Sequence, residues 1–90
     1  MKILEIINDN VYFNINERER KSIDNLDGGD IFNILENISN NNDYYDLDYD
    51  KNSIKNDVYK SLVEDLIKQF TDFKDNVDNM KKSINSTFID

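Results

Sequence analysis

Residues 53–85 read SIKNDVYKSLVEDLIKQFTDFKDNVDNMKKSIN, and apolar residues recur in them at alternating steps of four and three. These apolar positions are Tyr59, Val63, Leu66, Phe70, Phe73, Val77, Met80 and Ile84. Such steps place the side chains along one face of an α-helix. The sequence therefore predicts a long C-terminal helix over residues 53–85, with Ser53 or Asn56 as the N-cap.

The two halves of this helix carry apolar stripes of different width. Leu62 and Ile67 widen the stripe in the first half, which is typical of a helix that packs on a globular core. Beyond Phe73 only the narrow heptad seam continues, and it predicts a dimer seam at Phe73, Val77, Met80 and Ile84. A helix of this length measures roughly 48 Å. We expect it to project and pair, to break near Thr71, or to be wrapped by the rest of the chain.

The N-terminal part predicts antiparallel β-structure over residues 1–23. Residues 2–7 and 11–15 are rich in β-branched and aromatic side chains, and Asn8-Asp9-Asn10 between them favours a tight turn. A polar third strand at about residues 18–23 would turn the hairpin into a three-stranded meander. Its basic residues alternate with glutamates, which is typical of a solvated edge strand.

A short helix is predicted over residues 30–39, after the turn Asp27-Gly28-Gly29-Asp30. Its apolar residues fall on one helical stripe, and Asp27 or Asp30 is suited to cap its first turn. We expect this short helix, the N-terminal strands and the long C-terminal helix to share one hydrophobic core. The expected core residues are Val11, Phe13, Ile15, Ile31, Ile34, Leu35, Ile38, Leu62, Val63, Leu66 and Phe70.

An acidic loop rich in tyrosine and aspartate is expected over residues 40–52. In its second half aspartates alternate with tyrosines and a leucine, so an extended chain would turn the tyrosines to one side and the carboxylates to the other. Aspartates spaced in this way resemble the phosphates of a nucleic-acid strand, and tyrosines are favoured at interfaces. The predicted partner-binding residues are Asp43, Tyr44, Tyr45, Asp46, Asp48, Tyr49 and Asp50.

The same loop partly resembles a calcium-binding EF-hand loop. Asp46, Asp48, Asp50 and Asp57 fall at the first, third, fifth and twelfth positions of such a loop. Lys51 stands where that loop requires glycine, and Asp57 replaces its bidentate glutamate. A calcium-binding module is therefore only a second alternative, and a solvated acidic loop without a metal is the simpler interpretation.

The composition excludes several classes of chemistry. The chain of 90 residues has a net charge of −8 and contains no cysteine or histidine, so a thiol nucleophile, a disulfide and the usual zinc ligands are all excluded. We expect no enzyme activity and no cofactor. Negative charge opposes direct binding to nucleic acid or to anionic membranes and favours a basic protein partner, although it also serves solubility alone. Without a signal peptide or spanning segment, we expect a cytoplasmic protein.

The chain resembles small acidic proteins of phages and integrative elements in low-GC Gram-positive bacteria. The resemblance is carried by residues 2–6 with 11–15, by 23–27 with 30–35, by the acidic stretch, and by 55–62 (KNDVYKSL). It implies a role like that of anti-CRISPR proteins and other inhibitors of host defence, by size and charge, and assigns no functional residue.

These observations predict a single α+β domain spanning residues 1–90. The function they favour is that of a non-enzymatic acidic inhibitor that binds the basic, nucleic-acid-binding surface of a partner protein. The alternative is a structural or adaptor module that forms a homodimer through the C-terminal helix.

Overall fold

The computed structural model describes the backbone of residues 1–88 and the side chains of residues 1–80. It contains a three-stranded antiparallel sheet, in the order β1-β2-β3, followed by a short helix and a long helix. The predicted α+β fold is therefore confirmed. The elements are β1 (Leu4–Ile7), β2 (Asn10–Asn14), β3 (Arg20–Ser22), η1 (Ile23–Asn25), α1 (Gly28–Asn40), η2 (Lys51–Ser53) and α2 (Asp57–Phe88).

A two-residue turn joins β1 to β2. Asn8 and Asp9 have φ angles of 52° and 66°, in the left-handed region that asparagine and aspartate tolerate. Positive φ at both central residues matches the right-handed twist of a hairpin. Asn10, expected in the turn, instead pairs with Ile7 as the first residue of β2.

The third strand completes the meander as predicted, although it is only three residues long. Its entry is shaped by Asn16, whose Oδ1 accepts hydrogen bonds from the N–H groups of Arg18 (2.8 Å) and Glu19 (2.9 Å). Arg20 lies over the Tyr12 ring and forms an ion pair with Glu5 across the sheet. Arg20 of β3 thus links β1 and β2 through its side-chain contacts on the solvated face of the sheet.

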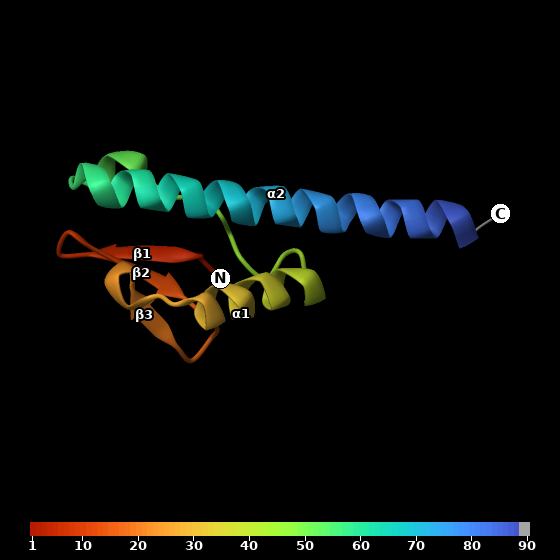
Figure 1. Ribbon diagram of the computed structural model, residues 1–90, viewed down its shortest axis with the longest axis horizontal. Helices are drawn as coiled ribbons and strands as arrows, with labels where there is room; N and C mark the ends of the chain where they lie inside the picture. The colour runs from red at the N-terminus through yellow and green to blue at the C-terminus, as the bar shows by residue number, and fades with distance from the viewer. Residues whose placement is uncertain (89–90) are drawn as a thin grey trace.

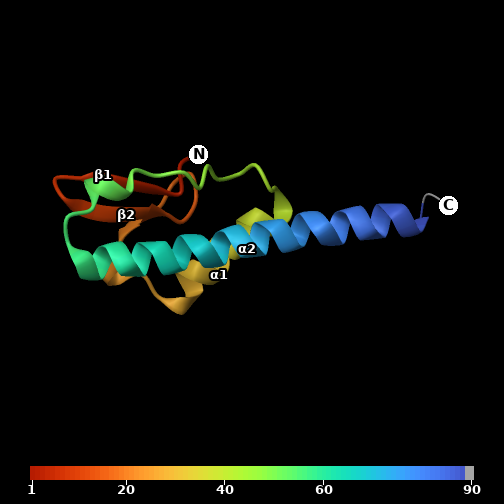
Figure 2. The same ribbon diagram turned by 90° about the horizontal axis from the view of Figure 1, so that it is seen from above.

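The core forms where α2 lies over the sheet and α1 (Figures 1 and 2). Phe13 of the sheet meets Phe70 of α2 edge to face, with 6.5 Å between ring centroids, and Val63 is fully buried one helical repeat earlier. Val11 and Ile15 face the same core as Phe13, as their alternation predicted. The first half of the α2 stripe is therefore core.

The predicted core needs several corrections. Leu62 was expected inside but is 46% exposed, because it precedes Val63 by one residue and so points about 100° away from the buried stripe. Three other expected core residues, Ile31, Leu35 and Leu66, are partly buried. The prediction also missed four buried residues: Ile3, Leu4, Tyr45 and Ile54.

Helix α2 begins four residues later than predicted and runs without a break. The Oδ1 atom of Asn56 accepts hydrogen bonds from the N–H groups of Val58 (2.9 Å) and Tyr59 (3.1 Å), so Asn56 is the N-cap, and Ser53 lies in η2 instead. Of the three alternatives for this long helix, the break near Thr71 does not occur. The helix projects past α1 (Figure 1) and sets the long dimension of a molecule of 53 × 25 × 20 Å.

Candidate functional site

The acidic segment (residues 43–50) lies beside the outer edge of β1. The Met1 ammonium donates to the Tyr44 carbonyl (3.0 Å), and the backbone of Asp46 bonds to both Met1 and Ile3, forming an isolated parallel bridge to Lys2. Figure 2 shows the segment running next to β1 before the chain turns into α2. The segment is therefore held in place as the start of a fourth, incomplete strand.

The segment has two distinct faces, as its alternation predicted. Asp46, Asp48 and Asp50 are exposed, whereas the residues between them turn inward. Tyr45 is buried, and Leu47 and Tyr49 are half-buried. Alternate carboxylates on an extended chain lie roughly 6.6–7 Å apart. The inward residues anchor the segment, so it presents an ordered row of carboxylates to solvent.

Tyr45 is a core residue and not the partner contact that was predicted. Its side chain is 3% exposed, and its hydroxyl donates to the Ile15 carbonyl (2.6 Å) and accepts from Asn37 Nδ2 (3.3 Å). Burial raises the pKa of this hydroxyl to about 12. The inward side of the segment therefore supports the fold, and the exposed carboxylates form its outer side.

The carboxylates of the acidic segment form no ion pair within residues 1–80. The four ion pairs found there are Arg20–Glu5, Lys21–Glu19, Lys21–Asp30 and Lys55–Asp9. Three of the four acidic partners lie in the sheet region and none in the segment. The row from Asp43 to Asp50 thus keeps its negative charge available to a ligand.

Two surface grooves flank the segment. The α2 groove, of about 450 Å³, lies between the segment and α2, and the lysines Lys51 and Lys74 share its lining with Asp46, Asp48 and Asp75. The β1 groove, of about 480 Å³, lies between the segment and β1, and its described lining sets Glu5, Asp48 and Asp50 against Lys2. Carboxylates outnumber lysines in both linings, and Glu5 of the β1 groove already forms its ion pair with Arg20.

The predicted calcium ligands are not brought together. Asp46 Oδ1 accepts a hydrogen bond from the Asp48 N–H (3.0 Å), and Asp50 Oδ1 accepts from the Asn52 N–H (2.9 Å), so both carboxylates close local turns. Asp57 instead occupies the first turn of α2. In the part of the chain that the structure describes, no three acidic side chains form a group that could hold a metal ion. The geometry argues against the calcium interpretation.

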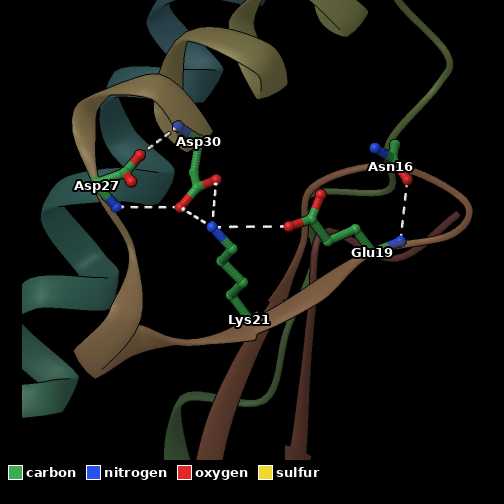
Figure 3. Close-up of polar contacts among 5 residues, drawn as sticks. All are labelled: Asn16, Glu19, Lys21, Asp27 and Asp30. Carbon is green, nitrogen blue, oxygen red and sulfur yellow. Dashed lines mark hydrogen bonds and ion pairs between the residues drawn. The ribbon is translucent and has the colours of Figure 1, made fainter.

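A partly buried ion pair that the sequence did not reveal joins β3 to α1 (Figure 3). Lys21 Nζ lies 3.0 Å from both carboxylate oxygens of Asp30, which is 6% exposed. The hydrogen bond to Lys21 lowers the pKa of Asp30, and the same bond raises the pKa of Lys21. With Asp27, Asp30 also forms a capping box at the start of α1. All of these bonds are internal, so the cluster is structural.

The predicted dimer seam is only partly free. Phe73 packs against the core and, with Phe32 and Leu35, lines an apolar hollow of about 300 Å³ between the two helices. Val77 is half-buried and Met80 is 63% exposed. The side chain of Ile84 lies outside the described residues. Within the described seam, exposed apolar surface is therefore concentrated at Met80.

Comparison with known proteins gives no relative: no family model matches the chain, and neither a curated protein nor a solved structure is significantly similar to it. The resemblance to phage and mobile-element proteins therefore stays a prediction. Among the described residues, neither helix combines the length and the apolar character that crossing a bilayer requires.

Proposed function

We propose that this protein is a non-enzymatic inhibitor that docks its acidic segment on a basic, nucleic-acid-binding surface of a partner protein. The observation that carries the proposal is the exposed row Asp46, Asp48 and Asp50, held on an extended backbone and without ion-pair partners within residues 1–80. A partner that normally holds phosphates would offer lysines and arginines to this row.

Rigid anchoring supports this proposal. An interface gains affinity when the binding residues are ordered before the partner arrives, because less conformational entropy is lost. The buried Tyr45 side chain fixes the segment to the core, and backbone hydrogen bonds to Met1 and Ile3 fix it to the chain before β1. The net charge of −8 adds long-range attraction to a basic surface and repels nucleic acid. The proposal includes a cytoplasmic location and a role like that of phage-encoded inhibitors.

The test replaces Asp46, Asp48 and Asp50 together by asparagine. Asparagine keeps the Oδ1 atoms that accept from the Asp48 and Asn52 N–H groups, so the turns stay closed while three charges are removed. Immobilised wild-type protein should retain nucleic-acid-binding proteins from a bacterial lysate, and single-stranded DNA should displace them. The triple variant should retain far less.

A second triple variant tests whether the position of the removed negative charges matters or only their number. Glu17→Gln, Asp65→Asn and Asp72→Asn remove the same three charges from exposed positions outside the acidic segment. This control should retain the same proteins as the wild type. Equal retention by both triple variants and the wild type would refute the proposed interface, and equal loss in both variants would leave only non-specific charge attraction.

A homodimeric adaptor is the second candidate function, and the projecting end of α2 favours it. Residues 71–88 carry three lysines against three aspartates, so this end is neutral while the rest of the chain holds the negative charge. Met80→Asp alters an exposed position and should leave the monomer folded. If α2 pairs, sedimentation will show a dimer for the wild type and a monomer for this variant; a wild-type monomer at all accessible concentrations excludes the adaptor role.

A further inference from the structure

The outer edge of β1 presents unpaired backbone groups. Residues of an antiparallel strand alternate between those that bond to the neighbour and those that point away. Asn14 N–H donates to the Ile3 carbonyl (2.9 Å). By the register of the two strands, Glu5 and Ile7 are then the residues of β1 whose backbone groups face β2. The N–H and C=O groups of Leu4 and Ile6 therefore point away from β2, and no other group in the described residues bonds to them.

Among the described residues, the backbone contact along this edge ends before β1 begins. Asp46 pairs with Lys2, and beyond that bridge the acidic segment separates from β1, so the β1 groove opens between them. Leu4 and Ile6 line one wall of this groove, and Asp48, Tyr49 and Asp50 line the other. One side of the groove therefore offers strand hydrogen bonds, and the other side offers negative charge.

We propose that the β1 groove binds an extended, basic peptide segment of the partner, which adds to the sheet as a strand along β1. Unpaired strand edges accept an added strand through their backbone groups. Side chains on one face of that strand recur every second residue, which is the spacing of Asp48 and Asp50, the carboxylates of the acidic segment that line this groove. Lysines or arginines at alternate positions of the peptide therefore match the row of carboxylates.

Charge complementarity selects this occupant over a second copy of the chain. In the described lining of the β1 groove, Asp48 and Asp50 are the carboxylates without an ion-pair partner, since Glu5 pairs with Arg20 and the one lysine there is Lys2. Each copy of the protein also carries a charge of −8. Pairing two such edges would bring like charges together, whereas a basic strand would neutralise them. This inference rests on the proposed function, because the same carboxylates recognise the partner in both.

Hydrogen exchange measured by NMR tests the edge itself. In the free protein, the amide proton of Ile6 should exchange quickly, and that of Leu4, which is 4% exposed, should still exchange faster than those of Glu5 and Ile7, which β2 protects. Saturation with a short synthetic peptide of alternating valine and lysine should protect Leu4 and Ile6 as well. Protection of both amides in the peptide-free protein overturns the inference, and protection that rises with protein concentration would identify a second copy as the occupant.

Backbone-methylated peptides distinguish strand addition from charge attraction. An added strand uses the N–H groups of only every second residue, so methylating one alternate set should weaken binding by at least about tenfold, whereas methylating the other set should not. Equal affinity of both methylated peptides would refute strand addition, even if the charges attract them. A valine–glutamate peptide should not bind, and its binding as tightly as the lysine peptide would also refute the inference.

Protein variants separate this inference from the proposed function. Ile6→Pro removes an outward N–H without touching the bonds to β2, and Ile6→Ala keeps that N–H as the matched control. Ile6→Pro should lose the peptide while Ile6→Ala binds it, with circular dichroism confirming that both are folded. If the asparagine triple variant loses the partner but the two backbone-methylated peptides bind with equal affinity, the proposed function stands and strand addition fails.

Discussion

Tyr45→Phe is the substitution that most clearly separates a structural tyrosine from a recognition tyrosine. The change removes one buried hydroxyl and leaves the ring in the core. The Ile15 carbonyl keeps a second donor, Asn37 Nδ2 at 2.9 Å, so no buried group loses its last partner. The expected cost is that of one net hydrogen bond, about 0.5–1.5 kcal/mol.

This cost is measurable by thermal and urea unfolding. For a domain of this size, a loss of about 1 kcal/mol lowers Tm by about 4–8 °C. Partner binding should be unchanged, because the hydroxyl lies inside. A variant with wild-type stability and weakened binding would refute the placement of Tyr45 in the core.

The pH dependence of the same variant gives an independent check. Burial raises the pKa of the Tyr45 hydroxyl from 10.0 to about 12, so the folded state favours the neutral form. The hydroxyl therefore stabilises the fold fully below the unfolded-state pKa, and this contribution is lost as pH rises through the folded-state value. The stability difference between wild type and Tyr45→Phe should shrink above pH 10. A difference that grows with pH in this range would contradict the assignment.

Two further perturbations test the scaffold around the site. Lys21→Met leaves the Asp30 carboxylate without its cation and should destabilise the fold. Because the pKa of Asp30 is lowered in the wild type, the ion pair stabilises the protein above the unfolded-state pKa of 3.8. This contribution is lost as the pH falls further. Urea unfolding across acidic pH should show a smaller pH dependence in the variant, and an unchanged profile would count against the ion pair. Asn56→Ala removes the N-cap of α2 and should cost about 0.5–2 kcal/mol, whereas Asn56→Asp, which keeps the accepting oxygen, should cost little; equal losses in both would disprove the cap.

Patterns that depend on local geometry were predictable from the sequence. The two-residue alternation placed Asp46, Asp48 and Asp50 on the exposed side, and the steps of four and three placed Val63 and Phe70 in the core. Such patterns need only the strand or helix repeat. The hairpin turn followed from the tolerance of asparagine and aspartate for positive φ.

Features that depend on distant partners were not predictable. The buried hydroxyl of Tyr45 is satisfied by a carbonyl 30 residues earlier in the chain, that of Ile15, which accepts a hydrogen bond from it. Asp30 pairs with Lys21 because β3 ends beside the first turn of α1, and the sequence gives no register between these two elements. The groove at β1 likewise depends on where the acidic segment leaves the sheet, which is a tertiary property.

The salt dependence of partner affinity shows whether the acidic segment is the recognition surface. Wild-type protein, the Asp46, Asp48 and Asp50 asparagine variant, and the charge-matched control should be titrated against one captured partner over a series of ionic strengths. We predict that affinity falls steeply with salt for the wild type and the control, and that the asparagine variant binds weakly with a shallow slope. If all three share one affinity and one slope, the acidic segment is not the recognition surface.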